Sequence, residues 1–136
     1  MSYRRQSREL VLQFLYGFDL NRTDLERALQ VFPGWGRANS EVDKFARELM
    51  VGTVTHLEEM DKLISGHTPN WNMDRIALVD KCILRLALYE LYFRDDIPPL
   101  ATINEAIEIA KKFSTDRSGS FINGILDKIN KEREED

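Results

Sequence analysis

The sequence contains few of the residues on which catalysis, metal binding or disulfide formation depends. It has one cysteine, Cys82, and two histidines, His56 and His67, so an internal disulfide is excluded. No HExxH or Cys–His zinc motif and no glycine-rich phosphate loop occurs. Cys82 lies in the most apolar segment, whereas a reactive thiolate needs an electropositive and partly exposed environment. We therefore predict a non-enzymatic protein that holds neither a cofactor nor a metal ion.

The sequence also lacks a long apolar run. No stretch approaches the ~20 apolar residues of a membrane span, and the polar, arginine-bearing start has no signal-peptide core. We expect a cytoplasmic protein that makes no contact with a membrane. The net charge of −4 argues against indiscriminate nucleic-acid binding over the whole surface, but it leaves room for a local basic patch.

What the sequence does contain is helical periodicity. Apolar residues recur at helical spacing and no segment alternates as a strand would. Hydrophobic residues make up 43% of the chain and charged residues 31%, a globular balance. We predict an all-α fold, a compact bundle of about six to seven helices; two three-helix halves sharing the helix from Met73 are one possible arrangement. Residues 1–130 should form a single domain and residues 131–136 a short charged tail.

Capping signals and breakers predict where individual helices begin and end. One long helix should cover Ser40–Ser65, and the segment Met73–Phe93, apolar almost all round, should be the central buried helix. In a capping box, a hydroxyl at the N-cap is followed three residues later by a carboxylate. Such boxes predict helix starts at Thr23 and at Thr102.

Three arginines near the start of the first helix give the first binding signal. Arg4, Arg5 and Arg8 occupy one arc of about 100°. Positive charge at a helix N-terminus costs about 0.3–1 kcal/mol per charge, since it opposes the helix dipole. A phosphate ligand would explain the arginines, and a frayed, solvated basic end is the alternative. Tyr16 lies on the side of Arg5, where it suits a base or a partner side chain, or covers a neighbouring helix.

A second signal lies near the start of the last helix. The segment Ser118–Phe121 combines hydroxyls with backbone N–H groups, which suit a phosphate, and Lys111 and Arg117 are close in sequence. Ordinary capping by a serine is the alternative. Gly124, which follows Asn123, costs about 1 kcal/mol inside a helix and predicts the close approach of another backbone.

Seven short sequence segments between about Arg4 and Ile129 occur in an order that is typical of one protein family. They are Arg4-Arg5-Gln6-Ser7-Arg8-Glu9, Leu15-Tyr16, Asn70-Trp71, Val79-Asp80, Ile83–Leu91, Ile103–Lys111 and Phe121–Asp127. This ordered set resembles the NusB family of bacterial transcription antitermination factors. The resemblance implies an all-helical protein that binds the boxA element of nascent RNA, notably in ribosomal RNA leaders. It implies joint action with NusE, a small-subunit ribosomal protein, on the RNA polymerase elongation complex with other Nus factors.

The resemblance also implies roles for residues, which we combine with the signals above. The acidic residue on the family's NusE-binding face corresponds to Asp80, and we add Asp74 and Tyr16 to this face. The residues expected to bind RNA are Arg4, Arg5, Arg8, Tyr16, Lys111, Arg117, Ser118, Phe121 and Asn123.

Two departures from the family pattern bear on RNA binding. Gln6 stands where arginine is frequent, which thins the N-terminal basic patch. Arg117 stands where an acid or a small polar residue is frequent, which moves positive charge to the second patch.

Two other functions remain open. One is the NusB-like RNA-binding domain of a ribosomal RNA methyltransferase, which would continue into a domain with a glycine-rich cofactor loop. The other is a purely protein-binding helical adaptor, which would leave the N-terminal arginines without a purpose. Self-association of the free protein is also left open.

Overall fold

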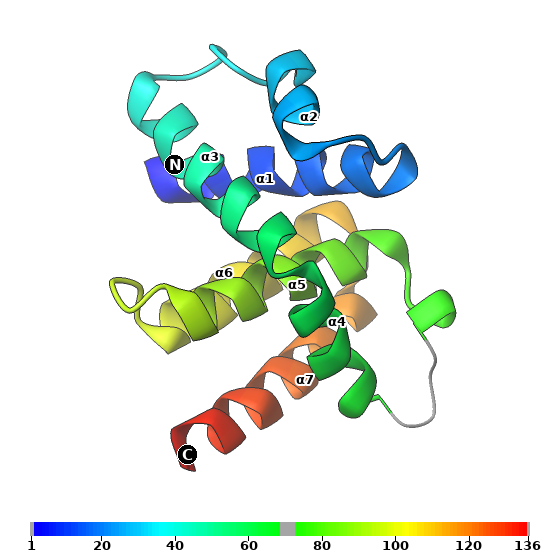
Figure 1. Ribbon diagram of the computed structural model, residues 1–136. Helices are drawn as coiled ribbons and strands as arrows, with labels where there is room; N and C mark the ends of the chain where they lie inside the picture. Colours follow the sequence, from blue (N-terminus) through cyan, green and yellow to red (C-terminus); the bar gives the residue numbers. More distant parts are fainter. Residues whose placement is uncertain (1, 69–72, 136) are drawn as a thin grey trace. The chain divides into compact units, whose positions relative to one another are not determined.

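The fold is built from helices throughout the residues that the computed structural model describes, 2–68 and 73–135 (Figure 1). Over these two ranges there are seven α-helices, one 3₁₀ turn and no strand, so the prediction of an all-α fold is confirmed. The elements are α1 (Tyr3–Leu20), α2 (Leu25–Val31), α3 (Ser40–Thr55), α4 (Leu57–Gly66), the 3₁₀ turn η1 (Met73–Arg75), α5 (Leu78–Phe93), α6 (Pro99–Phe113) and α7 (Asp116–Glu135).

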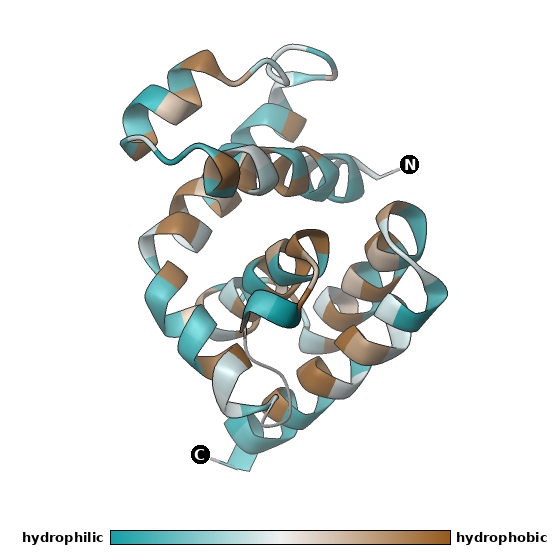
Figure 2. Ribbon diagram, turned by 90° about the vertical axis from the view of Figure 1, so that its right-hand side faces the viewer, coloured by the Kyte–Doolittle hydropathy of each residue, from teal (hydrophilic) through white to brown (hydrophobic). Residues whose placement is uncertain are grey.

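The chain divides into two compact units. The first ends at Thr55 and the second begins at His56. The first unit holds three helices, and the second holds four and the 3₁₀ turn. We had expected two halves of three helices that share a central helix; instead, α5 belongs to the second unit alone. Figure 2 shows apolar and polar residues alternating along the individual helices, as amphipathic helices require.

In the first unit, α1 and α2 both pack against α3. The hydroxyl of Ser7 lies 2.9 Å from the carbonyl oxygen of Val42, which ties α1 to α3. Rings of Phe14, Phe32 and Trp35 meet edge to face between α1 and the end of α2. The N-cap of α2 is Asp24, whose carboxylate accepts from the backbone N–H of Arg27, and not Thr23 as the capping box predicted.

The prediction of one long helix over Ser40–Ser65 is wrong, because the helix is interrupted at His56. The backbone of His56 (φ −107°, ψ 23°) leaves the helical conformation, and α4 begins at Leu57. The imidazole ring stacks on Phe93, with 3.9 Å between ring centroids. A break of one residue hardly shifts the apolar spacing, so periodicity alone could not reveal it.

The second unit is organised around α5, which packs against α4, α6 and α7. Its buried residues lie on all sides of the helix, as its all-round apolarity predicted. Three of them are charged: Asp80, Arg85 and Glu90. All three form side-chain bonds to neighbouring helices: Arg85 pairs with Asp61 of α4, Glu90 accepts from Thr102 of α6, and Asp80 accepts from Ser118 of α7. Cys82 is fully buried in this core.

Two predicted starts in this unit are shifted. The central helix begins at Leu78 rather than Met73, because Met73–Arg75 forms a 3₁₀ turn and Ala77 is extended. Helix α6 begins at Pro99, three residues before the predicted capping box. Proline at the first helical position sets the backbone angle and needs no N–H bond. Thr102 therefore lies inside the helix, and its hydroxyl bonds to Glu90.

Helix α7 is longer than predicted at both ends. It begins at Asp116, and its helical conformation continues through the charged residues to Glu135. The N–H of Ser118 bonds to the hydroxyl of Thr115 at 3.0 Å, which caps the first turn. Asn70 and Trp71, part of the family resemblance, lie outside the described residues. In the parts that are described, no helix is long and apolar enough to cross a membrane.

Candidate RNA- and partner-binding surfaces

The N-terminal arginines share a helix end but have different surroundings. Ser2 caps α1 by accepting from the N–H of Arg5. The guanidinium carbons of Arg4 and Arg8 lie 5.1 and 6.0 Å from the centroid of the Phe45 ring on α3. Arg4 and Arg5 are partly exposed, whereas only 4% of Arg8 is exposed. The solvated basic end considered above therefore does not describe Arg8, which covers an aromatic core residue.

Tyr16 is an exposed aromatic on the same helix. It retains 40% of its accessible surface. Eleven residues separate it from Arg5, which is close to three helical turns, so the two side chains lie on one face about 16 Å apart along the axis. The first unit therefore presents a cation and an aromatic ring on one face of α1.

Arg5→Ala tests whether this face contacts phosphates. We expect the slope of log K against log salt for RNA binding to fall by about one unit. The free energy of unfolding should change by less than about 0.5 kcal/mol, because Arg5 is partly exposed near the end of a helix. Binding titrations at several salt concentrations, with urea unfolding, measure both quantities.

Arg37→Ala is the matched control, since Arg37 is an exposed arginine of the same unit. An Arg5→Ala slope equal to that of the Arg37→Ala control would contradict phosphate contact. Arg8→Ala is a poor test, because removal of its buried stem also destabilises the packing on Phe45.

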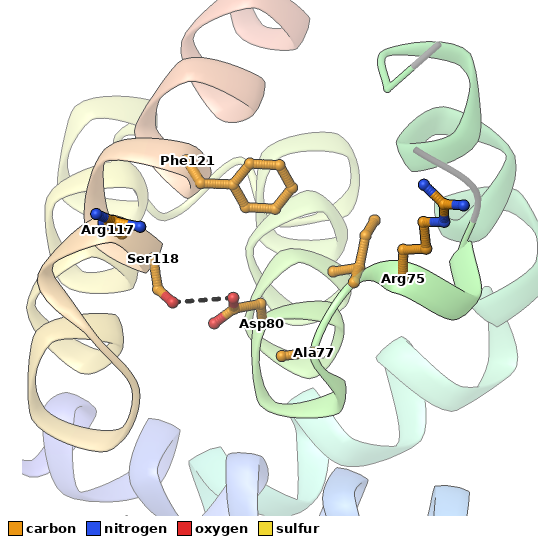
Figure 3. A pocket seen from close by; sticks show the side chains of 7 residues that line it. Arg75, Ala77, Asp80, Arg117, Ser118 and Phe121 are labelled. Carbon is orange, nitrogen blue, oxygen red and sulfur yellow. Dashed lines mark hydrogen bonds between the residues drawn. The ribbon is translucent and has the colours of Figure 1, made fainter. Parts of the chain in front are cut away.

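A pocket in the second unit collects several of the predicted residues. Its volume is about 440 Å³, and Figure 3 shows the side chains that line it. Although 38 positions separate them, Ser118 donates to the Oδ2 atom of Asp80 at 2.9 Å. The residues that line the pocket are Arg75, Ile76, Ala77, Asp80, Arg117, Ser118 and Phe121. The fold thus joins the start of α5 to the first turns of α7.

The carboxylate of Asp80 is a buried group in this pocket. Only 7% of the residue is exposed. The Oδ1 atom has no hydrogen-bond partner among the described residues, while Oδ2 is held by Ser118. A buried acceptor without a donor costs about 1–3 kcal/mol. Asp80, which the family resemblance assigns to the partner face, is therefore buried beneath that surface rather than exposed on it.

The hydroxyl groups near the start of α7 form hydrogen bonds largely with one another. The Oγ atom of Ser118 lies 2.8 Å from that of Ser114, and Thr115 caps the N–H of Ser118. The stem of Lys111 lies against Gly119, since a Cβ atom there would be 3.6 Å from its Cγ atom. The capping hydroxyl is thus that of Thr115 rather than of a serine, and the hydroxyl of Ser118 bonds to Asp80 and Ser114. Lys111 places a cation beside this turn.

Other predicted residues lie around the pocket rather than in it. Asp74 and Asn123 are exposed and are absent from its lining. Sequence analysis missed Arg75, which faces the pocket opposite Arg117 (Figure 3). Only the turn before α5 directs Arg75 there, so no local sequence signal could have identified it. No group of three potential metal ligands occurs in the described part of the chain.

Comparison with known proteins covers almost the whole chain. The profile of the NusB family matches residues 5–131. A protein of Thermodesulfovibrio yellowstonii, "Transcription antitermination protein NusB", is 45% identical, with 95% of this chain and 92% of the relative covered. The protein of the same name from Halalkalibacterium halodurans is 47% identical, with 92% and 91% covered.

Solved structures agree in fold. "T. maritima NusB" superposes with a TM-score of 0.85 at 42% identity, covering 95% of this chain and 91% of that one. A structure of "Antitermination Factors NusB and NusE in complex with dsRNA" superposes with a TM-score of 0.84 at 29% identity, covering 96% and 98%.

Proposed function

The chain belongs to the NusB family, and from this premise we propose that it is a transcription antitermination factor. It binds boxA RNA of nascent ribosomal RNA transcripts together with the ribosomal protein NusE. The observation that carries this proposal is the match, over 96% of the chain, to a NusB seen with NusE and double-stranded RNA. The protein works by binding, without catalysis, in the cytoplasm, as part of the RNA polymerase elongation complex with other Nus factors.

The relatives favour this function over the methyltransferase alternative. The chain covers 91% to 94% of the length of five relatives, each of which is named transcription antitermination protein NusB. The adaptor alternative is disfavoured by the cations at two surfaces, Arg4 and Arg5 in the first unit and Arg75 and Arg117 in the second. Clustered surface cations are the usual electrostatic footprint of nucleic-acid binding.

We assign the contacts according to exposure. Arg4 and Arg5 bind phosphates, and Phe121 and Arg117 hold RNA at the pocket in the second unit. Exposed Tyr16 and Asp74 meet the ribosomal protein directly. Asp80, which is buried, acts indirectly by holding the hydroxyl of Ser118 at the pocket wall.

The two ligands should bind cooperatively. The chain is acidic overall and its N-terminal patch is small, so we expect weak and poorly selective RNA binding by the chain alone. NusE adds a second surface, and boxA RNA should then bind roughly 5–150-fold more tightly, the usual range of coupling energies. Linkage requires RNA to strengthen the protein pair by the same factor.

A thermodynamic cycle checks this expectation. Fluorescence anisotropy at one salt concentration would give the affinity for boxA RNA with and without NusE, and calorimetry the affinity for NusE with and without RNA. Scrambled RNA of the same length is the control. Equal boxA affinity in the presence and absence of NusE would contradict a shared site. Equal affinity of the protein pair for scrambled RNA would contradict sequence reading.

A further inference from the structure

Gly124 lies in the middle of α7, at a position where the packing of the helix does not require a glycine. Glycine costs about 1 kcal/mol relative to alanine inside a helix. The sequence predicted that another backbone approaches there. In the described chain this is wrong: a Cβ atom built on Gly124 meets nothing within 4 Å. Gly119, five residues earlier, does face neighbours, since a Cβ atom built on it would lie 3.6 Å from the Cγ atom of Lys111. The bare backbone at Gly124 is therefore open to something outside the chain.

Gly124 continues the face of α7 that begins at the pocket. Arg117, Phe121, Gly124 and Lys128 follow one another at intervals of four, three and four residues, which places them on one side of a helix. We call these four residues the α7 strip. Arg117 and Phe121 line the pocket, and Lys128 stands about 16 Å further along the axis than Arg117.

The charges on and beside the α7 strip favour an anionic ligand. Arg117 and Lys128 are exposed, and neither has an ion pair with a described residue. Two acids are adjacent to these cations in sequence: Asp127 is already paired with Lys131 at 3.0 Å, and Asp116 is exposed at the first position of α7, about 100° around the helix from Arg117. Two cations that form no ion pair in the described chain thus lie on either side of the half-buried ring of Phe121 and the exposed backbone of Gly124.

The pocket at the head of the α7 strip places a cation beside an aromatic ring. Arg117 and Phe121 both line it, while Asp80 and Ser118, also in the lining, bond to each other at 2.9 Å. A nucleobase that enters the pocket can stack on Phe121 while Arg117 contacts the adjoining phosphate. The pocket therefore suits the base end of a nucleotide.

Resting on the proposed function, we propose that the α7 strip is the track of one RNA strand leaving the pocket. Arg117 and Lys128 contact phosphates, Phe121 stacks on a base, and Gly124 lets the sugar–phosphate backbone lie against the helix. A side chain at position 124 would hold the strand away from the helix surface. The strip thereby extends RNA contact beyond the residues predicted from sequence.

Substitution of Gly124 separates this role from a structural one. Gly124→Ala and Gly124→Gln should bind a boxA-containing oligonucleotide progressively less tightly, with a loss of about tenfold for Gln, equivalent to 1.4 kcal/mol. Both variants should melt at the same or a higher temperature, because they improve helix propensity. Lys128→Ala should lower the salt slope by about one unit. Anisotropy titrations in the presence of NusE measure each effect.

Gly66→Ala is the matched control, because Gly66 is also helical and also meets nothing within 4 Å. If the unmodified chain binds RNA and Gly124→Gln binds it equally well, the α7 track is wrong while the proposed function stands. Loss of NusE binding at unchanged RNA affinity would assign the strip to the protein partner and overturn the proposal. If the unmodified chain binds no boxA RNA even with NusE, both proposals fail.

Discussion

Asp61→Ala is expected to lower the free energy of unfolding by about 3 kcal/mol, because it leaves a buried guanidinium without its carboxylate. Arg85 lies in the core with 6% of its side chain exposed, and its Nε and Nη2 atoms bond to the two oxygens of Asp61 at 2.7 and 3.0 Å. Removal of one partner of such a pair exposes the full desolvation cost of the other. Urea unfolding of the full chain measures the change.

A bidentate pair near the surface provides the control. Arg94 and Asp96 have the same geometry, with both bonds at 2.9 Å, but 49% of the Asp96 side chain is exposed. Asp96→Ala should therefore cost less than about 1 kcal/mol. The double change of Asp61→Leu with Arg85→Met should recover most of the loss. Equal costs for Asp61→Ala and Asp96→Ala would contradict the importance of burial.

Leu88→Ala should cost about 3 kcal/mol, since it opens a cavity in the centre of the second unit. Leu88 is fully buried on α5. The loss combines the transfer free energy of the removed methyl groups with the energy of an unfilled space. Leu100→Ala, at a position that is 70% exposed on α6, should change stability by less than about 0.5 kcal/mol.

Unfolding curves of the two leucine variants, recorded by circular dichroism, would check this contrast. Similar stabilities would show that α5 is not the packing centre that its burial indicates. Below the unfolding transition, Leu88→Ala should still bind boxA RNA with unchanged affinity, because no surface residue has changed. Loss of binding by the folded variant would mean that core packing positions the pocket.

The elements of this fold could be predicted well because helices leave a local signal. Apolar residues at intervals of three and four identify each amphipathic helix from its own sequence. The same spacing placed Tyr16 away from the apolar stripe, and the structure confirms that it is exposed. Helix boundaries leave a weaker local signal. The interruption at His56 and the start of α6 at Pro99 depend on where neighbouring helices pack, which periodicity does not show.

The candidate sites depended far more on tertiary contacts. From sequence, Arg4, Arg5 and Arg8 were equivalent cations, yet of the three only Arg8 is buried, with its guanidinium 6.0 Å from the Phe45 ring on another helix. A ring 37 positions away in the sequence leaves no trace in the local pattern around Arg8.

Local residue patterns thus suffice to identify the all-helical class and the family to which the chain belongs. Which polar residues are buried, which are exposed and which meet depends on contacts between separate helices. Asp80 and Ser118 share a hydrogen bond across 38 positions, and Asp61 and Arg85 share an ion pair across 24. The physical reason is that helix formation follows interactions within a few residues, whereas burial and pairing depend on how separate helices pack against one another.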